Sequence, residues 1–299
     1  MGIVDVQAAF LAHEKRKVVS FNRVLTIGRQ SQYLSRNLLI SLSNRYGLTF
    51  DIQGILNCQY ADMFLKALLN INTLQSLDYS PYESSDIIHD MNHSVSDDLH
   101  QRFDVVIDGG SLEHVFNLPV ALANCMNLVK RGGSIFMFSP ANNCMGHGFY
   151  QFSPELYFRV FRPDNGFAVQ EIILTEHPFP GTELSPSVRC FSVVDPEIAG
   201  SRVNLVSRRP IGMMVHAIRT EIKPIFARFP LQSDYASTYA LNDKITAPTT
   251  SKKVRMTFKN AARVVLNNIP SKIRNEIIGR YQLFVHSFAN ERHYKRWYP

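Results

Sequence analysis

The middle segment of the chain, residues 103–140, constrains the fold most because it predicts one complete strand, helix and strand. The apolar run at 105–107 is typical of a buried parallel strand, and it stops at Asp108-Gly109-Gly110. Pro119 suits the first turn of the helix that should follow. Residues 135–138 then supply the next buried strand. Ligands of open parallel sheets bind beyond the carboxyl ends of the strands, so we expect a site at these two ends.

The rest of the chain continues this alternation of strands and helices. The helix after Pro119 should end in a basic last turn and a glycine stop at Lys130-Arg131-Gly132-Gly133. The roughly forty-five residues between Gly28 and Thr73 predict two helices. Further strands are expected at 23–27, 74–77, 86–90, 169–175, 203–207 and 211–218, and further helices at 34–42, 61–70 and 153–161. This order predicts an α/β protein with a mostly parallel sheet and helices on both faces.

Composition places the chain among ordinary globular proteins. Of its 299 residues, 45% are hydrophobic and 19% are charged, which does not fit a disordered chain. No apolar run of about eighteen residues predicts a membrane-spanning helix, and the amino terminus lacks the pattern of a signal peptide, so we expect a cytoplasmic protein. The four cysteines are widely spaced and form no CxxC pair, so neither a zinc site nor a disulfide framework is expected.

The positive charge of the chain is concentrated in its tail. Residues 251–299 hold eleven Lys or Arg and two acids, a net charge of +9, whereas the first 250 residues carry −2. Two helices, at 254–268 and 271–286, are expected there, followed by an ending that interleaves basic and aromatic residues. The tail therefore predicts peripheral contact with an anionic membrane or an acidic partner. A solvated helical cap is the simpler alternative, and no motif for nucleic acid accompanies the tail.

Three acids stand at successive predicted strand ends, Asp78, Asp90 and Asp108, and Gly28 stands at the first strand end. In this arrangement residues 23–207 resemble the class I S-adenosylmethionine-dependent methyltransferases. The segment LEHV resembles the family's segment after the fourth strand, and KRGGSIFMFSP resembles the family's strand that follows a basic, glycine-rich turn. The resemblance implies a Rossmann-like sheet and the cofactor S-adenosyl-L-methionine. It also implies a domain at 18–220, with a helical segment at 1–17 before it and a basic, mostly helical extension at 221–299.

The resemblance also assigns roles to residues at the strand ends. Gly28 would line the methionine part of the cofactor, Asp78 would bind the ribose, and Asp90 with Met91 would edge the adenine. Asp108 with Gly109 would face the sulfonium. The full set expected at the cofactor is Gly28, Arg29, Asp78, Tyr79, Asp90, Met91, Asp108 and Gly109.

The first loop departs from the family pattern. The family usually has (D/E)xGxGxG, whereas this chain reads TIGRQSQ with a single glycine. Glycines there let the backbone approach a ligand closely. Their loss favours an alternative, in which a methyltransferase-like fold serves as a non-catalytic binding or assembly module. A third alternative, an RNA methyltransferase, lacks the NPPY-type tetrapeptide, because IDGG stands in its place. The run Asp90-Met91-Asn92-His93 lacks the spacing of a metal site, and no metal is expected.

The loop at 142–152 is the expected substrate lid, because it follows the fifth strand and combines glycines with polar and aromatic residues. His147 lies between two glycines and is the first candidate for the base that removes a hydroxyl proton. His114 is the second candidate, and Asp108 completes the expected catalytic set. Glu113, Asn142, Tyr150 and Gln151 are the expected substrate contacts. These residues favour O-methylation of a small molecule or a glycan (sugar) acceptor.

Overall fold

The structure, a computed structural model, describes residues 2–178, 188–235 and 270–298. The chain divides into two compact units. The first unit comprises the residues up to 193, residues 207–230 and the residues from 296, and the second comprises 194–206 and 231–295. The expected division at residues 17 and 220 stays a prediction.

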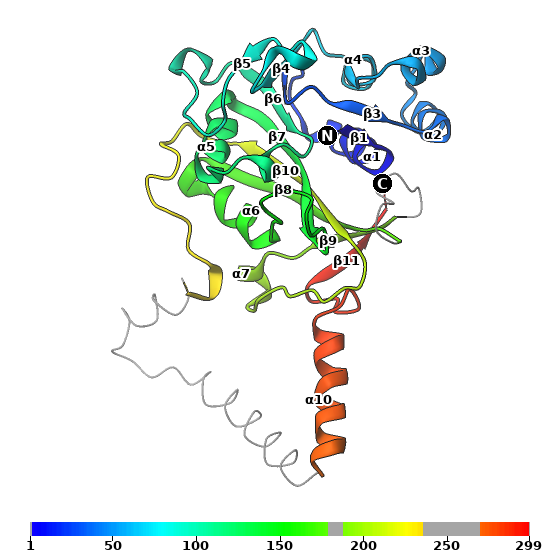
Figure 1. The fold of residues 1–299 in the computed structure, drawn as a ribbon, viewed down its shortest axis with the longest axis vertical. Coiled ribbons are helices and arrows are strands. Elements are labelled where there is room, and N and C mark those ends of the chain that lie inside the picture. Colours follow the sequence, from blue (N-terminus) through cyan, green and yellow to red (C-terminus); the bar gives the residue numbers. More distant parts are fainter. Residues whose placement is uncertain (1, 179–187, 236–269, 299) are drawn as a thin grey trace. The chain divides into compact units, whose positions relative to one another are not determined.

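A sheet of nine strands forms the centre of the described chain, in the order β11-β9-β8-β10-β7-β6-β2-β4-β5 (Figure 1). Neighbours from β5 to β7 are parallel, whereas β10 is antiparallel to both β7 and β8. The strands are β2 (Arg23–Ile27), β4 (Thr73–Asp78), β5 (Ile87–Ile88), β6 (Phe103–Asp108), β7 (Val129–Asn142), β8 (Phe167–Glu176), β9 (Arg189–Val193), β10 (Ile211–Arg219) and β11 (Tyr294–Trp297). The predicted α/β architecture is confirmed.

Helices flank this sheet, and a small parallel sheet joins β1 (Gly2–Val4) to β3 (Ser31–Tyr33). The α-helices are α1 (Asp5–Glu14), α2 (Arg36–Tyr46), α3 (Ile52–Asn57), α4 (Asp62–Leu69), α5 (Leu118–Leu128), α6 (Pro154–Val160), α7 (Pro196–Ala199) and α10 (Ser271–Val285). The short 3₁₀ helices are η1 (Lys15–Lys17), η2 (Pro81–Glu83), η3 (Asp97–Leu99), η4 (Leu112–His114) and η5 (Pro163–Asn165). No helix in these described ranges has the length and apolarity needed to cross a bilayer.

The helix ends follow local sequence signals. Ser35 caps α2 by accepting a hydrogen bond from the Leu38 amide, and Gly47 ends that helix with φ of 63°. Ser153 and Pro154 begin α6 as predicted. In the second unit, α10 confirms the helix expected at 271–286. The helix expected at 254–268 lies outside the described residues.

Three local predictions are wrong. Residues 130–133 are not a helical turn, because α5 ends at Leu128 and these residues form a bulge at the start of β7, between the pairs Phe103–Val129 and Val105–Ser134. A Cβ atom on Gly133 would lie 2.6 Å from the Asp104 carbonyl oxygen, so the glycine permits a close approach of two strands rather than a helix stop. Between Gly28 and Thr73 there are three helices, α2, α3 and α4, instead of two.

The third error concerns residues 203–207, which form no strand. Their backbone groups form hydrogen bonds within the second unit instead of in the sheet. The Val206 amide donates to the His286 carbonyl at 2.7 Å, and the Asn204 carbonyl accepts a hydrogen bond from the Tyr294 hydroxyl at 3.1 Å. Contacts with a segment eighty residues away therefore override the local preference.

The amino-terminal helix α1 packs against the first unit's core, where Phe10 contacts the rings of Phe136 and Phe138. It also brings a carboxyl group into the protein interior. Glu14 is fully buried, and its Oε2 lies 2.8 Å from both His216 Nδ1 and Lys17 Nζ. Burial raises the pKa of Glu14, but the hydrogen bonds from His216 and Lys17 outweigh this effect, so its pKa is lowered. Glu14 therefore ties α1 to the sheet through a buried hydrogen bond with His216 of β10.

Candidate functional site at the carboxyl ends of the strands

Three of the predicted cofactor residues meet at one edge of the sheet. Gly28, Asp78 and Asp108 lie at the carboxyl ends of the neighbouring strands β2, β4 and β6, where Ile27 pairs with both Leu77 and Asp108. Gly28 has φ of 70°, and its amide donates to the Leu77 carbonyl at 2.7 Å. The parallel register therefore places these residues together, as expected for a site at strand ends.

A glutamine closes the first loop in place of the missing glycines. Gln30 is buried, and its Nε2 donates to the Ile27 carbonyl at 2.8 Å and to the Gly28 carbonyl at 3.0 Å. A Cβ atom on Gly109 would lie 1.9 Å from Gln30 Oε1, so the amide packs directly on that glycine. Gln30 Oε1 has no hydrogen-bond partner among the described residues. Sequence reasoning missed Gln30, although the single-glycine loop was the signal that something must replace the glycines.

The other predicted cofactor residues form local contacts. Arg29 Nη2 donates a hydrogen bond to Asp62 Oδ2 of α4 at 2.8 Å, and Arg29 Cζ lies 4.2 Å from the centre of the Tyr60 ring. Asp78 Oδ1 accepts from the Tyr79 amide at 2.6 Å, while the Tyr79 side chain is exposed.

The Asp90 carboxylate organises the turn that follows it. Asp90 Oδ1 accepts hydrogen bonds from the amide and the side chain of Asn92, and these bonds lower the pKa of Asp90. Met91 is buried, with its sulfur 3.8 Å from Asn124 Nδ2. Asp90 thus fixes the turn after β5, and its adenine role stays a prediction.

Two buried carboxyl groups lie beyond the end of β6. Asp108 Oδ1 accepts a hydrogen bond from the Ser111 amide at 2.8 Å, whereas Asp108 Oδ2 and Glu113 Oε2 have no hydrogen-bond partner in the described parts of the chain. Burial raises the pKa of Asp108 to about 7. Burial, together with the charge of Asp108, raises the pKa of Glu113 to about 8. Buried carboxyl groups with an oxygen that lacks a hydrogen-bond partner favour a cationic ligand.

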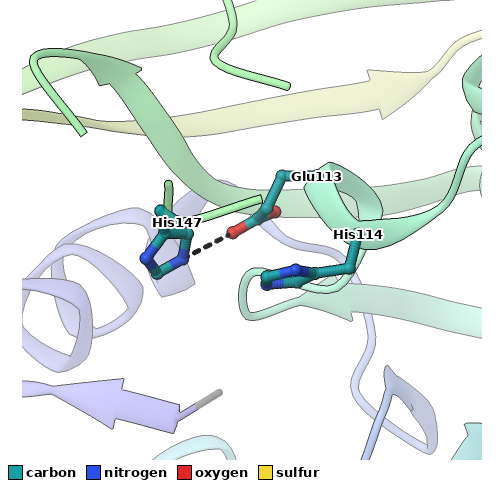
Figure 2. Close-up of side chains that lie close together, drawn as sticks. All are labelled: Glu113, His114 and His147. Atoms are coloured by element: carbon teal, nitrogen blue, oxygen red, sulfur yellow. Dashed lines mark ion pairs between the residues drawn. The ribbon is translucent and has the colours of Figure 1, made fainter. Parts of the chain in front are cut away.

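Glu113, His114 and His147 converge at one point (Figure 2). Glu113 and His114 come from η4, and His147 comes from the loop after β7. His147 Nε2 lies 3.3 Å from Glu113 Oε1, and the two imidazole rings lie 5.4 Å apart, centre to centre. Burial and the charge of His147 lower the pKa of His114. One ligand atom from each residue lies within 4.8 Å of the others, so this trio could hold a metal ion.

A cavity of about 400 Å³ opens beside this trio. Gly109, Glu113, His114 and His147 are the predicted residues that line it. The amino-terminal segment, β3, β7, β10 and the end of β8 contribute further walls, with Val4, Tyr33, Thr175, His177 and Met213 among the residues there. Sequence reasoning missed these five residues, because each comes from a distant segment without a local pattern. No lysine or arginine is found among the described residues that line the cavity.

The remaining predicted substrate residues hold the loop instead of lining the cavity. The Tyr150 hydroxyl donates to the Phe116 carbonyl at 2.7 Å, and Gln151 Oε1 accepts from the Cys144 amide at 2.8 Å. Asn142 Oδ1 accepts from the Asn143 amide at 3.0 Å. These contacts shape the segment that carries His147.

No model of a known protein family matches the chain, and no curated protein sequence matches it. Among solved structures, the chain is similar to the YcgJ protein from Bacillus subtilis, at 10% identity over 72% of this chain and 98% of that one, with a TM-score of 0.40. A SAM-dependent methyltransferase from Thermotoga maritima aligns at 10% identity over 72% of this chain and 95% of that one, with a TM-score of 0.39. The trans-methyltransferase CalH in complex with SAH aligns at 12% identity over 71% of this chain and 55% of that one, with a TM-score of 0.35.

Because these TM-scores lie below 0.5, the fold assignment rests on the order and direction of the strands. Five neighbouring strands, from β5 to β7, are parallel, and the reversed β10 lies between β7 and β8. This arrangement gives the chain a Rossmann-like α/β fold in which β10 is reversed.

Proposed function

We propose that this chain is an S-adenosylmethionine-dependent methyltransferase that methylates an oxygen of a small molecule or glycan acceptor. The observation that carries the proposal is the pair of buried carboxyl oxygens, on Asp108 and Glu113, that lack hydrogen-bond partners among the described residues. Glu113 also lines the cavity. The cofactor carries a sulfonium and an ammonium group. Both cations match acceptor atoms at this edge of the sheet, where Gln30 adds a third oxygen without a partner in the described chain.

The same edge offers a place for each part of the cofactor. Gly28 and Gln30 would lie against its methionine part, Asp78 against its ribose, and Asp90 with Met91 against its adenine. When bound, the cofactor supplies an electrophilic methyl group. The protein's task is to align the acceptor oxygen with that methyl group and to remove the hydroxyl proton.

The cavity next to the trio is the proposed acceptor site. In the simplest form of the proposal, His147 takes the hydroxyl proton, and Glu113 orients the imidazole at 3.3 Å. Neutral polar groups such as Ser139, Thr175 and Tyr33 line the cavity together with apolar side chains. The described lining has no lysine or arginine, which favours an uncharged acceptor over a phosphate-bearing one such as RNA.

Replacing Asp78 by Ala should weaken binding of S-adenosylhomocysteine by about 1 to 3 kcal/mol, the scale of lost hydrogen bonds to a charged group. Titration calorimetry on folded protein would measure this loss. Asp97→Ala is the matched control, since the Asp97 carboxylate is fully exposed on η3 and should not affect affinity. Equal affinity of the Asp78 variant and the wild type would remove Asp78 from the ribose role.

The tail is proposed to contact anionic membranes. In α10, the apolar residues Ile273, Ile277, Tyr281 and Phe284 are exposed and lie at helical spacing. We expect the full chain to bind anionic vesicles at low salt and to release them as salt rises, because exposed charges are screened over about 10 Å at 0.1 M. Charge reversal at Lys272 and Arg274 should reduce this binding in a vesicle sedimentation assay. If the wild type does not bind anionic vesicles at low ionic strength, the membrane proposal is wrong.

A further inference from the structure

The side chains of Glu113, His114 and His147 have the geometry of a metal-binding set. Two atoms bound to one metal ion at about 2.1 Å, with angles between about 90° and 110°, lie about 3.0 to 3.4 Å apart. Glu113 Oε1 and His147 Nε2 already lie 3.3 Å apart. A nitrogen of His114 completes a group whose atoms all lie within 4.8 Å of one another. Small side-chain rotations would therefore place all three on one ion.

Backbone contacts bring these ligands together from separate elements. The Glu113 carbonyl accepts hydrogen bonds from the Phe149 amide at 2.8 Å and from the Tyr150 amide at 3.2 Å. A Cβ atom on Gly148 would lie 2.8 Å from that same carbonyl oxygen, so the glycine permits this close docking. The loop that carries His147 is thus fastened directly to η4.

A second observation points to a cation at the same place. Glu113 is 1% exposed, and its other oxygen, Oε2, is buried without a hydrogen-bond partner in the described residues. A buried carboxylate is stable when it is paired or coordinates a metal. The His147 side chain is 53% exposed, so one side of the trio stays accessible.

The trio also has open space on its ligand side, because all three residues line the cavity of about 400 Å³. Three protein ligands with free positions are characteristic of catalytic metal sites, whereas structural zinc sites use four protein ligands. Two imidazoles and one carboxylate suit divalent zinc, iron, cobalt or manganese.

We propose that Glu113, His114 and His147 bind one divalent transition-metal ion that holds the hydroxyl oxygen of the acceptor. This inference rests on the proposed function. The ion lowers the pKa of the bound hydroxyl, and its proton passes to water. The resulting oxygen attacks the methyl carbon, the bond from carbon to sulfur breaks, and its electron pair stays on sulfur. The products are a methyl ether and S-adenosylhomocysteine, and His147 acts as a ligand instead of a base.

Cobalt titration of the metal-stripped full chain tests this site. We expect one Co²⁺ per chain, with a visible absorption spectrum of nitrogen and oxygen ligation. Each of Glu113→Gln, His114→Ala and His147→Ala should weaken Co²⁺ binding at least about tenfold, the lower end of the effect of altering a metal's surroundings. His93→Ala is the matched control, because the His93 side chain is 79% exposed and lies outside the trio. Absence of binding, or equal binding by the folded Glu113→Gln variant and the wild type, would overturn the proposal.

Parallel calorimetry of the same protein with S-adenosylhomocysteine separates this inference from the proposed function. Cofactor binding without Co²⁺ binding would overturn the metal site and leave the methyltransferase proposal standing. Co²⁺ binding without cofactor binding would overturn the methyltransferase proposal and support the metal site.

Discussion

Replacing His147 by Ala should lower the single-turnover rate of methyl transfer by about a hundredfold to ten-thousandfold, the range for loss of a group that handles the hydroxyl proton. Its affinity for S-adenosylhomocysteine should change little, because His147 belongs to the loop after β7, whereas Gly28 and Asp78 stand at the ends of β2 and β4, which β6 separates from β7 in the sheet. The loss should appear in the rate of chemistry instead of in binding. Rapid-quench measurement with excess enzyme would separate the two quantities.

The His114→Ala variant provides the comparison, since its imidazole lies 5.4 Å from that of His147 and faces the same cavity. A large rate loss in both variants supports a shared role in preparing the hydroxyl. A wild-type rate in the His147 variant would eliminate this residue from the chemistry. A loss of rate in the His114 variant alone would assign the role to His114 of η4.

Replacing Glu14 by Ala should lower the free energy of unfolding by about 1 to 3 kcal/mol, the cost of leaving a buried hydrogen-bonding group without its partner. His216 and Lys17 would lose their common acceptor, and His216 is fully buried against Ser134 and the Phe136 ring. Urea denaturation would measure the loss. Glu291→Ala is the control, because Glu291 is an exposed acid. A loss below 1 kcal/mol for Glu14→Ala would contradict the role given to this pair.

The same pair predicts that acid weakens the contribution of Glu14 to stability. The native pKa of Glu14 lies below its usual value of 4.5, so the stability it contributes is lost as pH falls through that lowered pKa. Burial also lowers the pKa of His216 from 6.5, so the unfolded chain takes up protons first as pH falls below that value. Both effects lower the free energy of unfolding as pH falls. The raised pKa values of Asp108 and Glu113 act in the opposite direction over the same range, so the pair is measured as the difference in the free energy of unfolding between the wild type and Glu14→Ala. That difference should shrink as pH falls below 4.5, and a constant difference would contradict this account.

The sequence predicted the sheet well because strands and helices in this fold carry strong local signals. Apolar runs that stop at Gly28, Asp78 and Asp108 mark the carboxyl ends of β2, β4 and β6, and parallel pairing brings them to one edge. The predictions failed where distant contacts decide the structure, as at 203–207. Local patterns also gave no sign of the pairing between Glu14 and His216, which are 202 residues apart.

The candidate site was predictable to a similar degree. Glu113, His114 and His147 were named from their places after two strands, and the structure brings them together because the Glu113 carbonyl binds the amides of the His147 loop. Gln30 was missed, since a polar residue in a loop has no pattern that predicts burial. The walls that Val4 and Thr175 contribute to the cavity depend on packing between separate segments, which periodicity does not encode.

Calorimetric titration of the wild-type chain with S-adenosylmethionine and S-adenosylhomocysteine tests the central claim most directly. The buried carboxyl oxygens of Asp108 and Glu113, together with Gln30, predict saturable binding of both compounds with one site per chain. Circular dichroism on the same sample would establish that the protein is folded. Binding of neither compound by folded protein would contradict the methyltransferase account, and it would favour a methyltransferase-like fold that serves as a binding or assembly module.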